Sequence, residues 1–173
     1  GKKAPSFSAP AVVNGGEMVD SFTLDQYLGQ KYVVFFFYPA DFTFVCPTEI
    51  KGFQKLMDEF EADDVALIGA STDSFFSHKE WFANRDTFPQ EIKHPVLADT
   101  NHNVSRLFGV LKEDAGIAYR ATVIVDDKGV IRSIAVNDTE VGRSPTEVLR
   151  TVQAFQSGGL CGAQWKKGDG FVG

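Results

Sequence analysis

Hydrophobic residues form two kinds of pattern along the chain, and the two alternate. Short runs with no polar face are typical of strands that are buried on both sides of a sheet. Such runs occur at residues 31–38 and 65–70, and further short strands are predicted at residues 96–98, 119–125 and 130–136. Apolar residues at three- and four-residue steps indicate the buried face of a helix. This spacing predicts helices at residues 47–60, 75–85, 104–108 and 145–155.

Two hairpins are also predicted. Residues 7–13 and 18–24 are separated by an Asn-Gly-Gly sequence at residues 14–16, which can adopt the positive φ of a tight turn. A second turn at residues 126–129 joins the last two predicted strands. Strands that alternate with helices and end in a hairpin and a final helix predict an α/β fold, with a central mixed sheet flanked by helices. The N-terminal hairpin is expected to be an antiparallel extension of that fold.

The start of the last helix carries the clearest signals. Ser144 and Glu147 match a capping box, and Pro145 fits the first helical position. After this helix the chain becomes rich in glycine. We therefore divide the chain into one domain at residues 1–156 and a C-terminal segment at residues 157–173.

Composition narrows the classes of function. The 173 residues are 43% hydrophobic, which is enough for one substantial core. The formal net charge of -6 argues against a nucleic-acid partner, because such a partner requires a basic surface. No apolar run approaches the roughly 20 residues that span a bilayer, and no secretion signal begins the chain. We expect a soluble, cytoplasmic protein without a membrane or nucleic-acid partner.

The two cysteines, Cys46 and Cys161, are the candidate reactive groups. They are too far apart in sequence for a C-x-x-C motif, which argues against a zinc ribbon and against a general disulfide oxidoreductase. Cys46 falls where a predicted strand gives way to a helix, and the N–H groups and dipole of a helix start stabilise a thiolate. A buried structural cysteine is the alternative. The nearby hydroxyl of Thr43 favours the reactive thiol.

Residues 36–49, Phe-Phe-Tyr-Pro-Ala-Asp-Phe-Thr-Phe-Val-Cys-Pro-Thr-Glu, resemble the peroxidatic motif of the typical two-cysteine peroxiredoxins. That group includes the peroxidase component of the bacterial alkyl hydroperoxide reductases. The core of the motif, Pro-x-x-x-Thr-x-x-Cys, falls on Pro39, Thr43 and Cys46. The resemblance extends over nearly the whole chain, through residues 71–81, 117–120, 141–143, 160–161 and Trp165. It implies a thioredoxin-like fold.

The resemblance also implies roles for the residues around the sulfur. Cys46 is expected to attack hydrogen peroxide or an organic hydroperoxide and to become a sulfenic acid. Thr43 is expected to orient the peroxide, Pro39 to shield the sulfur from water, and Arg120 to activate the thiolate and bind the peroxide oxygens. Attack on an O–O bond releases hydroxide or alkoxide, so a permanently charged donor beside it stabilises the developing charge.

Arg120 also stands out by its position, because it interrupts an apolar strand. In isolation, an arginine that extends from a strand end to water is the alternative. The need of Cys46 for a cation makes the functional interpretation the preferred one. Glu49 and Arg143 resemble supporting residues of the same network, and a surface ion pair is the alternative for both.

Cys161 resembles the resolving thiol, which condenses with the sulfenic acid to form a disulfide. In the family this thiol belongs to the neighbouring subunit of a homodimer, and such dimers often assemble into decamers. Gly162 and Ala163 replace the commoner Pro-Ala, whereas Trp165 keeps its place. An incidental free cysteine is the alternative. A thioredoxin-like protein or a flavoprotein disulfide reductase would recycle the disulfide, and no bound cofactor is needed.

Other features give weaker signals. The three histidines, His78, His94 and His102, are too scattered to form a recognised metal site with the cysteines. A holdase chaperone is the main rival from another class of function. The over-oxidation-sensitive members of the family that this chain resembles have a Gly-Gly-Leu-Gly sequence and a Tyr-Phe tail helix. Residues 86–94 lack the first, and no Tyr-Phe helix follows Cys161 before Gly173, so the resemblance implies that Cys46 resists over-oxidation.

Overall fold

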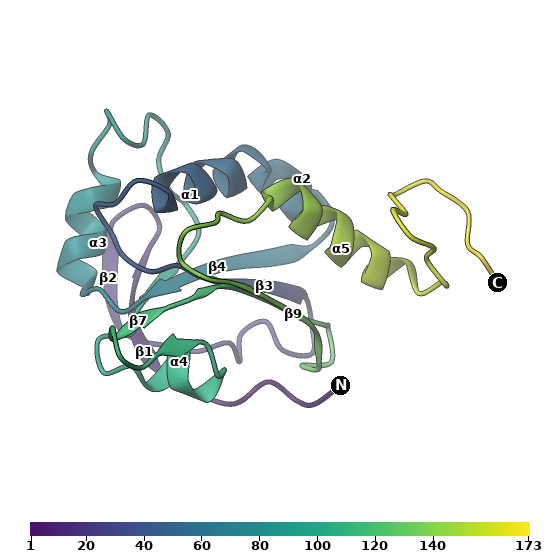
Figure 1. Ribbon diagram of the computed structural model, residues 1–173, viewed down its shortest axis with the longest axis horizontal. Coiled ribbons are helices and arrows are strands. Elements are labelled where there is room, and N and C mark those ends of the chain that lie inside the picture. The colour runs from purple at the N-terminus through teal and green to yellow at the C-terminus, as the bar shows by residue number, and fades with distance from the viewer.

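Seven strands form one mixed sheet at the centre of the computed structural model, which describes residues 1–173 (Figure 1). In chain order they are β1 (Ala9–Val13), β2 (Glu17–Phe22), β3 (Tyr32–Phe37), β4 (Val65–Ser71), β5 (Val96–Ala98), β8 (Arg120–Val125) and β9 (Ile131–Asn137). Their order across the sheet is β2-β1-β5-β4-β3-β8-β9. Two short strands, β6 (Leu111–Lys112) and β7 (Ile117–Ala118), pair with each other outside this sheet. Sequence patterns did not predict these two.

The middle of the sheet is apolar on both faces. β3 is parallel to β4 on one side and antiparallel to β8 on the other. Successive side chains of a strand point to opposite faces. Val33, Phe35 and Phe37 therefore enter one core cluster, and Val34 and Phe36 enter the other. All five are fully buried, so the loop that follows β3 starts from a firmly packed strand end.

Five helices cover the sheet (Figure 1). They are α1 (Cys46–Lys55), α2 (Met57–Ala62), α3 (Phe75–Phe82), α4 (Asn103–Leu107) and α5 (Pro145–Ser157). Buried residues of α1, α2, α3 and α5 join the core cluster that contains Phe36, whereas Val104 of α4 joins the opposite one. The helix predicted at residues 47–60 is divided at Leu56 into α1 and α2. The Leu56 N–H donates to the Phe53 carbonyl at 3.0 Å, and this tighter turn ends α1.

Both predicted hairpins are present. β1 and β2 are antiparallel, and the turn between them has Asn14 at φ 51° and Gly15 at φ 80°. β1 also pairs with β5, so the N-terminal hairpin continues the central sheet instead of standing apart from it. β8 and β9 form the second hairpin, with Gly129 at φ 79°. The predicted fold class, a central mixed sheet flanked by helices, is confirmed.

The last helix begins with half of the predicted capping box. Ser144 Oγ accepts from the Glu147 N–H at 3.3 Å, but the Glu147 carboxylate pairs with Arg150 at 2.6 Å instead of returning to the cap. After α5, Gly158 adopts a left-handed conformation with φ 71°, and residues 158–173 form no helix or strand. No helix of the structure combines the length and the apolar character needed to cross a membrane.

Candidate active site

Cys46 occupies the first position of α1, directly after the loop that follows β3. The residue is 1% exposed. No side chain caps this end of the helix, and Pro47 has no N–H to donate. The positive end of the helix dipole therefore acts on the sulfur. The predicted place of Cys46, between a strand and a helix, is confirmed.

Arg120 is the hydrogen-bond partner of Cys46. It is the first residue of β8, and its Nη1 donates to Cys46 Sγ at 3.2 Å and to Glu49 Oε1 at 2.7 Å. Its Nε donates to the Thr139 carbonyl at 2.8 Å. Burial acts to lower the pKa of Arg120, but Cys46 and Glu49 outweigh it and the pKa is raised above its ordinary value. Because Arg120 is only 5% exposed, an arginine that extends to water is excluded.

Glu49 joins both arginines in a buried ion-pair network. Its Oε2 accepts from the Arg143 Nε at 2.6 Å and from the Arg143 backbone N–H at 2.7 Å. The two side chains are 1% and 6% exposed, so the surface ion pair left open by the sequence is excluded. Burial lowers the pKa of Arg143, but a guanidinium ordinarily titrates so far above neutral pH that it stays charged. Arg143 also donates to the carbonyls of Ala121 and Phe37, which ties the network to β8 and β3.

This network has an unbalanced positive charge while Cys46 is a thiol. Arg120 and Arg143 are cations, and Glu49 is the one carboxylate that contacts them. A thiolate at Cys46 makes the group neutral. Charges interact strongly in a buried site because the effective dielectric constant is low. The arrangement can therefore stabilise negative charge that develops at or beside the sulfur.

Pro39 and Thr43 lie in the loop between β3 and α1, in different surroundings. Pro39 is buried, whereas Thr43 is exposed. The Thr43 hydroxyl donates to the Ala40 carbonyl at 2.8 Å and makes no hydrogen bond with Cys46. Its oxygen can still accept a hydrogen bond from a bound molecule. The structure thus places Arg120 in contact with the Cys46 sulfur, whereas the Thr43 hydroxyl makes no hydrogen bond with that sulfur.

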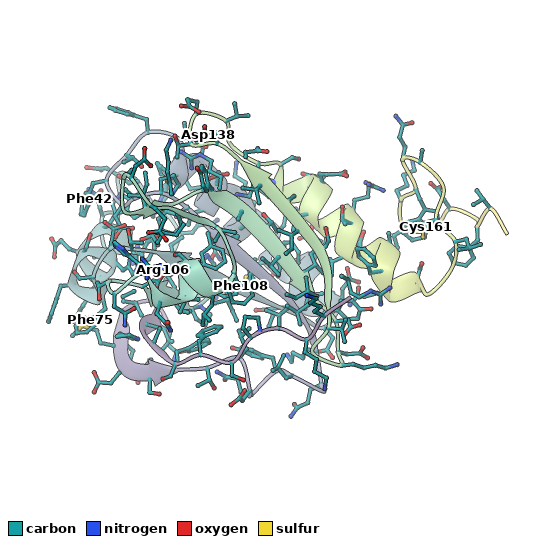
Figure 2. The ribbon with its side chains drawn as sticks, turned by 60° about the horizontal axis from the view of Figure 1, so that its bottom comes forward. Phe42, Phe75, Arg106, Phe108, Asp138 and Cys161 are labelled. Atoms are coloured by element: carbon teal, nitrogen blue, oxygen red, sulfur yellow. The ribbon has the colours of Figure 1, made fainter.

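The C-terminal segment, which contains Cys161, extends beyond the end of α5 and away from the layered body of the molecule (Figure 1). Cys161 is partly exposed, and its sulfur contacts the Ser157 hydroxyl at 3.3 Å and the Ala154 carbonyl at 3.6 Å. Figure 2 shows Phe42, a residue of the loop before Cys46, and Cys161 at opposite ends of the molecule. Both cysteines are free. Within one chain, the structure does not bring the two thiols together.

The C-terminal segment folds back on itself and on the end of α5. Trp165 is 5% exposed, and its ring stacks on Phe171 with centroids 6.1 Å apart. Arg150 donates to the Trp165 carbonyl at 2.5 Å, and Lys167 pairs with Asp63 of the main domain at 2.6 Å. Trp165 is therefore a packing residue.

Sequence patterns missed a buried polar cluster beside the Cys46 loop. Side-chain atoms of Asp41, Asp73 and His78 lie within 4.8 Å of one another. Asp41 follows β3 and Asp73 follows β4, and His78 lies on α3. Residues after the carboxyl ends of neighbouring parallel strands meet at one edge of the sheet. The position of the two aspartates after such strands is the signal that could have revealed the cluster.

Both the sequence and the fold are similar to those of known proteins. Residues 1–134 match the family described as the AhpC/TSA family. A peroxiredoxin of Cynops pyrrhogaster is 51% identical over 174 residues, which cover 97% of this chain and 86% of that protein. A thioredoxin peroxidase of Echinococcus granulosus is 49% identical over 174 residues, covering 97% and 89%. The crystal structure of a reduced 2-Cys peroxiredoxin from Plasmodium vivax gives a TM-score of 0.92 at 38% identity, covering 98% and 90% of the two chains.

Proposed function

The chain belongs to the AhpC/TSA family as a typical two-cysteine peroxiredoxin, and from that premise we propose how its two thiols act. It is a thiol-dependent peroxidase that reduces hydrogen peroxide and organic hydroperoxides. Cys46 is the nucleophile, and Cys161 is the resolving thiol. An external reductant then restores both thiols, so no bound cofactor takes part.

In the first step the Cys46 thiolate attacks one oxygen of the peroxide while the O–O bond breaks. The sulfur becomes a sulfenic acid, and the other oxygen leaves as hydroxide or alkoxide, which takes up a proton to give water or an alcohol. Arg120 donates toward the oxygens, where negative charge develops. Thr43 accepts a hydrogen bond from the peroxide, and Pro39 keeps bulk water from the sulfur.

The observation that carries this proposal is the 3.2 Å contact between Arg120 Nη1 and Cys46 Sγ inside a buried network. Glu49 and Arg143 hold Arg120 in place, and the unbalanced charge of the network can stabilise negative charge at the sulfur. Burial of a charged arginine is costly unless it has charged or hydrogen-bonding partners. A buried arginine beside Cys46 therefore argues against a purely structural cysteine, which would not need a cation. The arrangement suits a reaction in which negative charge moves from sulfur to oxygen.

In the second step the Cys161 thiol attacks the sulfur of the sulfenic acid, which forms a disulfide and releases water. We propose that this Cys161 belongs to the other subunit of a homodimer, and that dimers assemble further into a decamer. The separation of Cys46 from Cys161 within one chain supports an exchange between subunits. Residues 1–156 then form the peroxidase domain, and residues 157–173 form the segment that reaches the partner.

The disulfide needs an external electron donor. A thioredoxin-like protein and a flavoprotein disulfide reductase are the two candidates, and both act in a reducing compartment such as the cytoplasm. One of the relatives is named a thioredoxin peroxidase, which favours the first candidate. Steady-state turnover with each donor in turn distinguishes them.

Stopped-flow measurement of peroxide consumption by stoichiometric reduced protein tests the first step. The wild-type protein should consume one equivalent per Cys46, and Cys46→Ser should consume none. Cys161→Ser is the matched control, because it removes the other thiol without touching the Arg120 network. Equal consumption by wild type and Cys46→Ser would overturn the assignment of the nucleophile.

A further inference from the structure

The carboxylate of Asp41 is completely buried in the loop between β3 and α1. Its Oδ1 accepts from the Tyr38 hydroxyl at 2.7 Å. Its Oδ2 accepts from the Ser77 hydroxyl at 2.8 Å and from His78 Nδ1 at 2.7 Å. A buried carboxylate is tolerated only with such partners, because desolvation of a charge is otherwise very costly. The position of Asp41 is therefore set by three donors.

His78 is held between two acceptors. Its Nδ1 faces the Asp41 carboxylate, and its Nε2 lies 2.9 Å from the Leu97 carbonyl of β5. A carbonyl and a carboxylate accept hydrogen bonds and have no proton to donate. The ring is therefore hydrogen-bonded on both sides. Burial raises the pKa of Tyr38 well above its ordinary value, with the Asp41 charge as a second cause, so the phenol keeps its proton and donates.

The backbone of Asp41 is anchored as well. Its N–H donates to Asp73 Oδ2 at 2.9 Å, and the same oxygen accepts from the buried Ser71 hydroxyl at 2.5 Å. Ser71 ends β4 and Asp73 precedes α3, so this anchor comes from outside the loop. These existing bonds already use the atoms of the cluster that could bind a metal ion.

Asp41 is the only buried residue between Ala40 and Phe44. Its neighbour Phe42 has φ 58°, a left-handed conformation that a non-glycine residue keeps only where its surroundings enforce it. The Phe42 ring packs on Trp81 of α3, with centroids 5.8 Å apart. The loop therefore keeps its shape through contacts on the α3 side, and Thr43 follows directly after Phe42.

Cys46 and Arg120 are held by different contacts. Cys46 is part of α1, and Arg120 is fixed by Glu49 and by the Thr139 carbonyl. None of these contacts involves Asp41 or His78. Loss of the cluster should therefore displace Thr43 and leave the sulfur and its guanidinium in place.

We propose that Asp41, His78 and Tyr38 are positioning residues of the peroxidase: a buried, hydrogen-bonded cluster that fixes the Thr43 loop against α3. This inference rests on the proposed function. None of the three touches the reacting atoms. They act through Thr43, whose hydroxyl has to meet the peroxide. A displacement of about 1 Å in a group that orients a substrate can lower a rate by about 100-fold.

The central variant is His78→Leu, which removes both hydrogen bonds of the ring. Two reactions of Cys46 are compared: consumption of stoichiometric hydrogen peroxide, and alkylation by iodoacetamide, which needs a thiolate but no peroxide orientation. We expect the peroxide rate constant to fall roughly 10- to 100-fold, and the alkylation rate to stay at the wild-type value. Equal loss of both rates, or of neither, would overturn the proposal.

His94→Leu is the matched control. His94 is also buried, at 2% exposure, and packs on Phe36 with centroids 5.4 Å apart. Its one hydrogen bond is with the Pro95 carbonyl, so no hydrogen bond joins it to the loop. Its replacement should alter stability but leave the ratio of the two rates unchanged. A wild-type protein that consumed no peroxide would instead refute the proposed function, so the two failures are distinguishable.

Tyr38→Phe is the second variant, in case His78→Leu fails to fold. It removes one hydroxyl from a buried ring and leaves the shape of the core intact. The peroxide rate should fall by a smaller factor than in His78→Leu, again without a change in alkylation. A Tyr38→Phe protein with the full peroxide rate would count against the cluster.

Discussion

Cys46 and Cys161 are the same chemical group in opposite surroundings. Cys46 is 1% exposed, lies at a helix start and accepts a hydrogen bond from Arg120. Cys161 is partly exposed in a segment without helix or strand, and its hydrogen-bond partners are the neutral groups of Ser157, Ala154 and Gly159. One thiol is surrounded by fixed charges, and the other by its own neighbours in sequence.

The difference follows from what each thiol is proposed to do. Attack on peroxide moves charge within a small volume, so it gains from donors that are already in place. The resolving thiol has to reach a sulfur held elsewhere, and ordering around it would oppose that movement. In the reduced protein, the start of α1 and the Arg120 hydrogen bond hold Cys46 in place. In the proposed mechanism, the C-terminal segment is the part that moves to bring Cys161 to that sulfur.

Cys161→Ser should give the largest effect and separate the two regions completely. The first equivalent of peroxide should be consumed at the wild-type rate, because the Cys46 network is untouched. Turnover with a dithiol reductant should be abolished, because no resolving thiol remains. Single-turnover and steady-state assays on one preparation measure both. Unimpaired turnover would mean that the reductant attacks the sulfenic acid directly.

Glu49→Gln should destabilise the Cys46 region most. Removal of one partner from a buried ion pair costs about 3–5 kcal/mol, because it leaves uncompensated buried charge. Here two cations would face each other without a carboxylate. Urea unfolding at neutral pH measures the change.

Glu147→Gln is the control for this loss of stability. Glu147 pairs with Arg150 on the surface of α5, where the two side chains are 57% and 31% exposed. Solvent screens such a pair, so its loss should cost less than about 1 kcal/mol. Equal losses in Glu49→Gln and Glu147→Gln would show that burial of the first network contributes nothing.

Arg120→Met tests the charge beside the nucleophile. Methionine fills space but cannot donate, and removal of one donor to developing charge typically lowers a rate by about 100- to 1,000-fold. The stoichiometric peroxide reaction should fall by this factor, and iodoacetamide alkylation should slow as well. Arg106→Met, which breaks the exposed pair with Glu113, should leave both rates unchanged. A fall in the Arg106 variant would point to overall charge instead.

Acid should destabilise the domain around Cys46 at a higher pH than it disrupts the contact between the C-terminal segment and that domain. Burial lowers the pKa of His94, on the Cys46 side of the sheet, to about 4 from an ordinary 6.5. Because the folded pKa is the lower one, its contribution to stability is complete above pH 6.5 and is lost as the pH falls toward 4. Between these two pKa values the free energy of unfolding should fall by about 1.4 kcal/mol for each pH unit, which amounts to about 3 kcal/mol in all.

Urea unfolding at pH 7, 5.5 and 4 measures this dependence. His94→Leu should flatten it, because the variant has no ring to protonate. The contact of the C-terminal segment with the main domain should persist over the same range. Burial raises the pKa of Asp63, but Lys167 and other donors outweigh it and hold that pKa below its ordinary value. An equally steep dependence in His94→Leu would assign the acid sensitivity to other groups.

Local patterns predicted the elements well where one physical signal dominated. The unbroken apolar run at residues 31–38 became β3, since only a central strand buries both faces. The turn residues Asn14 and Gly15 predicted a hairpin but not that β1 would pair with β5. Leu56 divides a continuous apolar stripe, and the stripe itself carries no sign of the break. β6 and β7 are too short to show any periodicity.

The candidate site was predictable as far as its motif extends. The sequence alone determined that Cys46 starts a helix after a buried strand, because that signal lies within a few neighbouring residues. Whether Glu49 and Arg143 form a surface pair or a buried network was decided only by the tertiary structure. Burial depends on which distant strands and helices pack over a residue, and no local spacing records it. The same reason hid the Asp41–His78 pair, whose members come from two elements far apart in the chain.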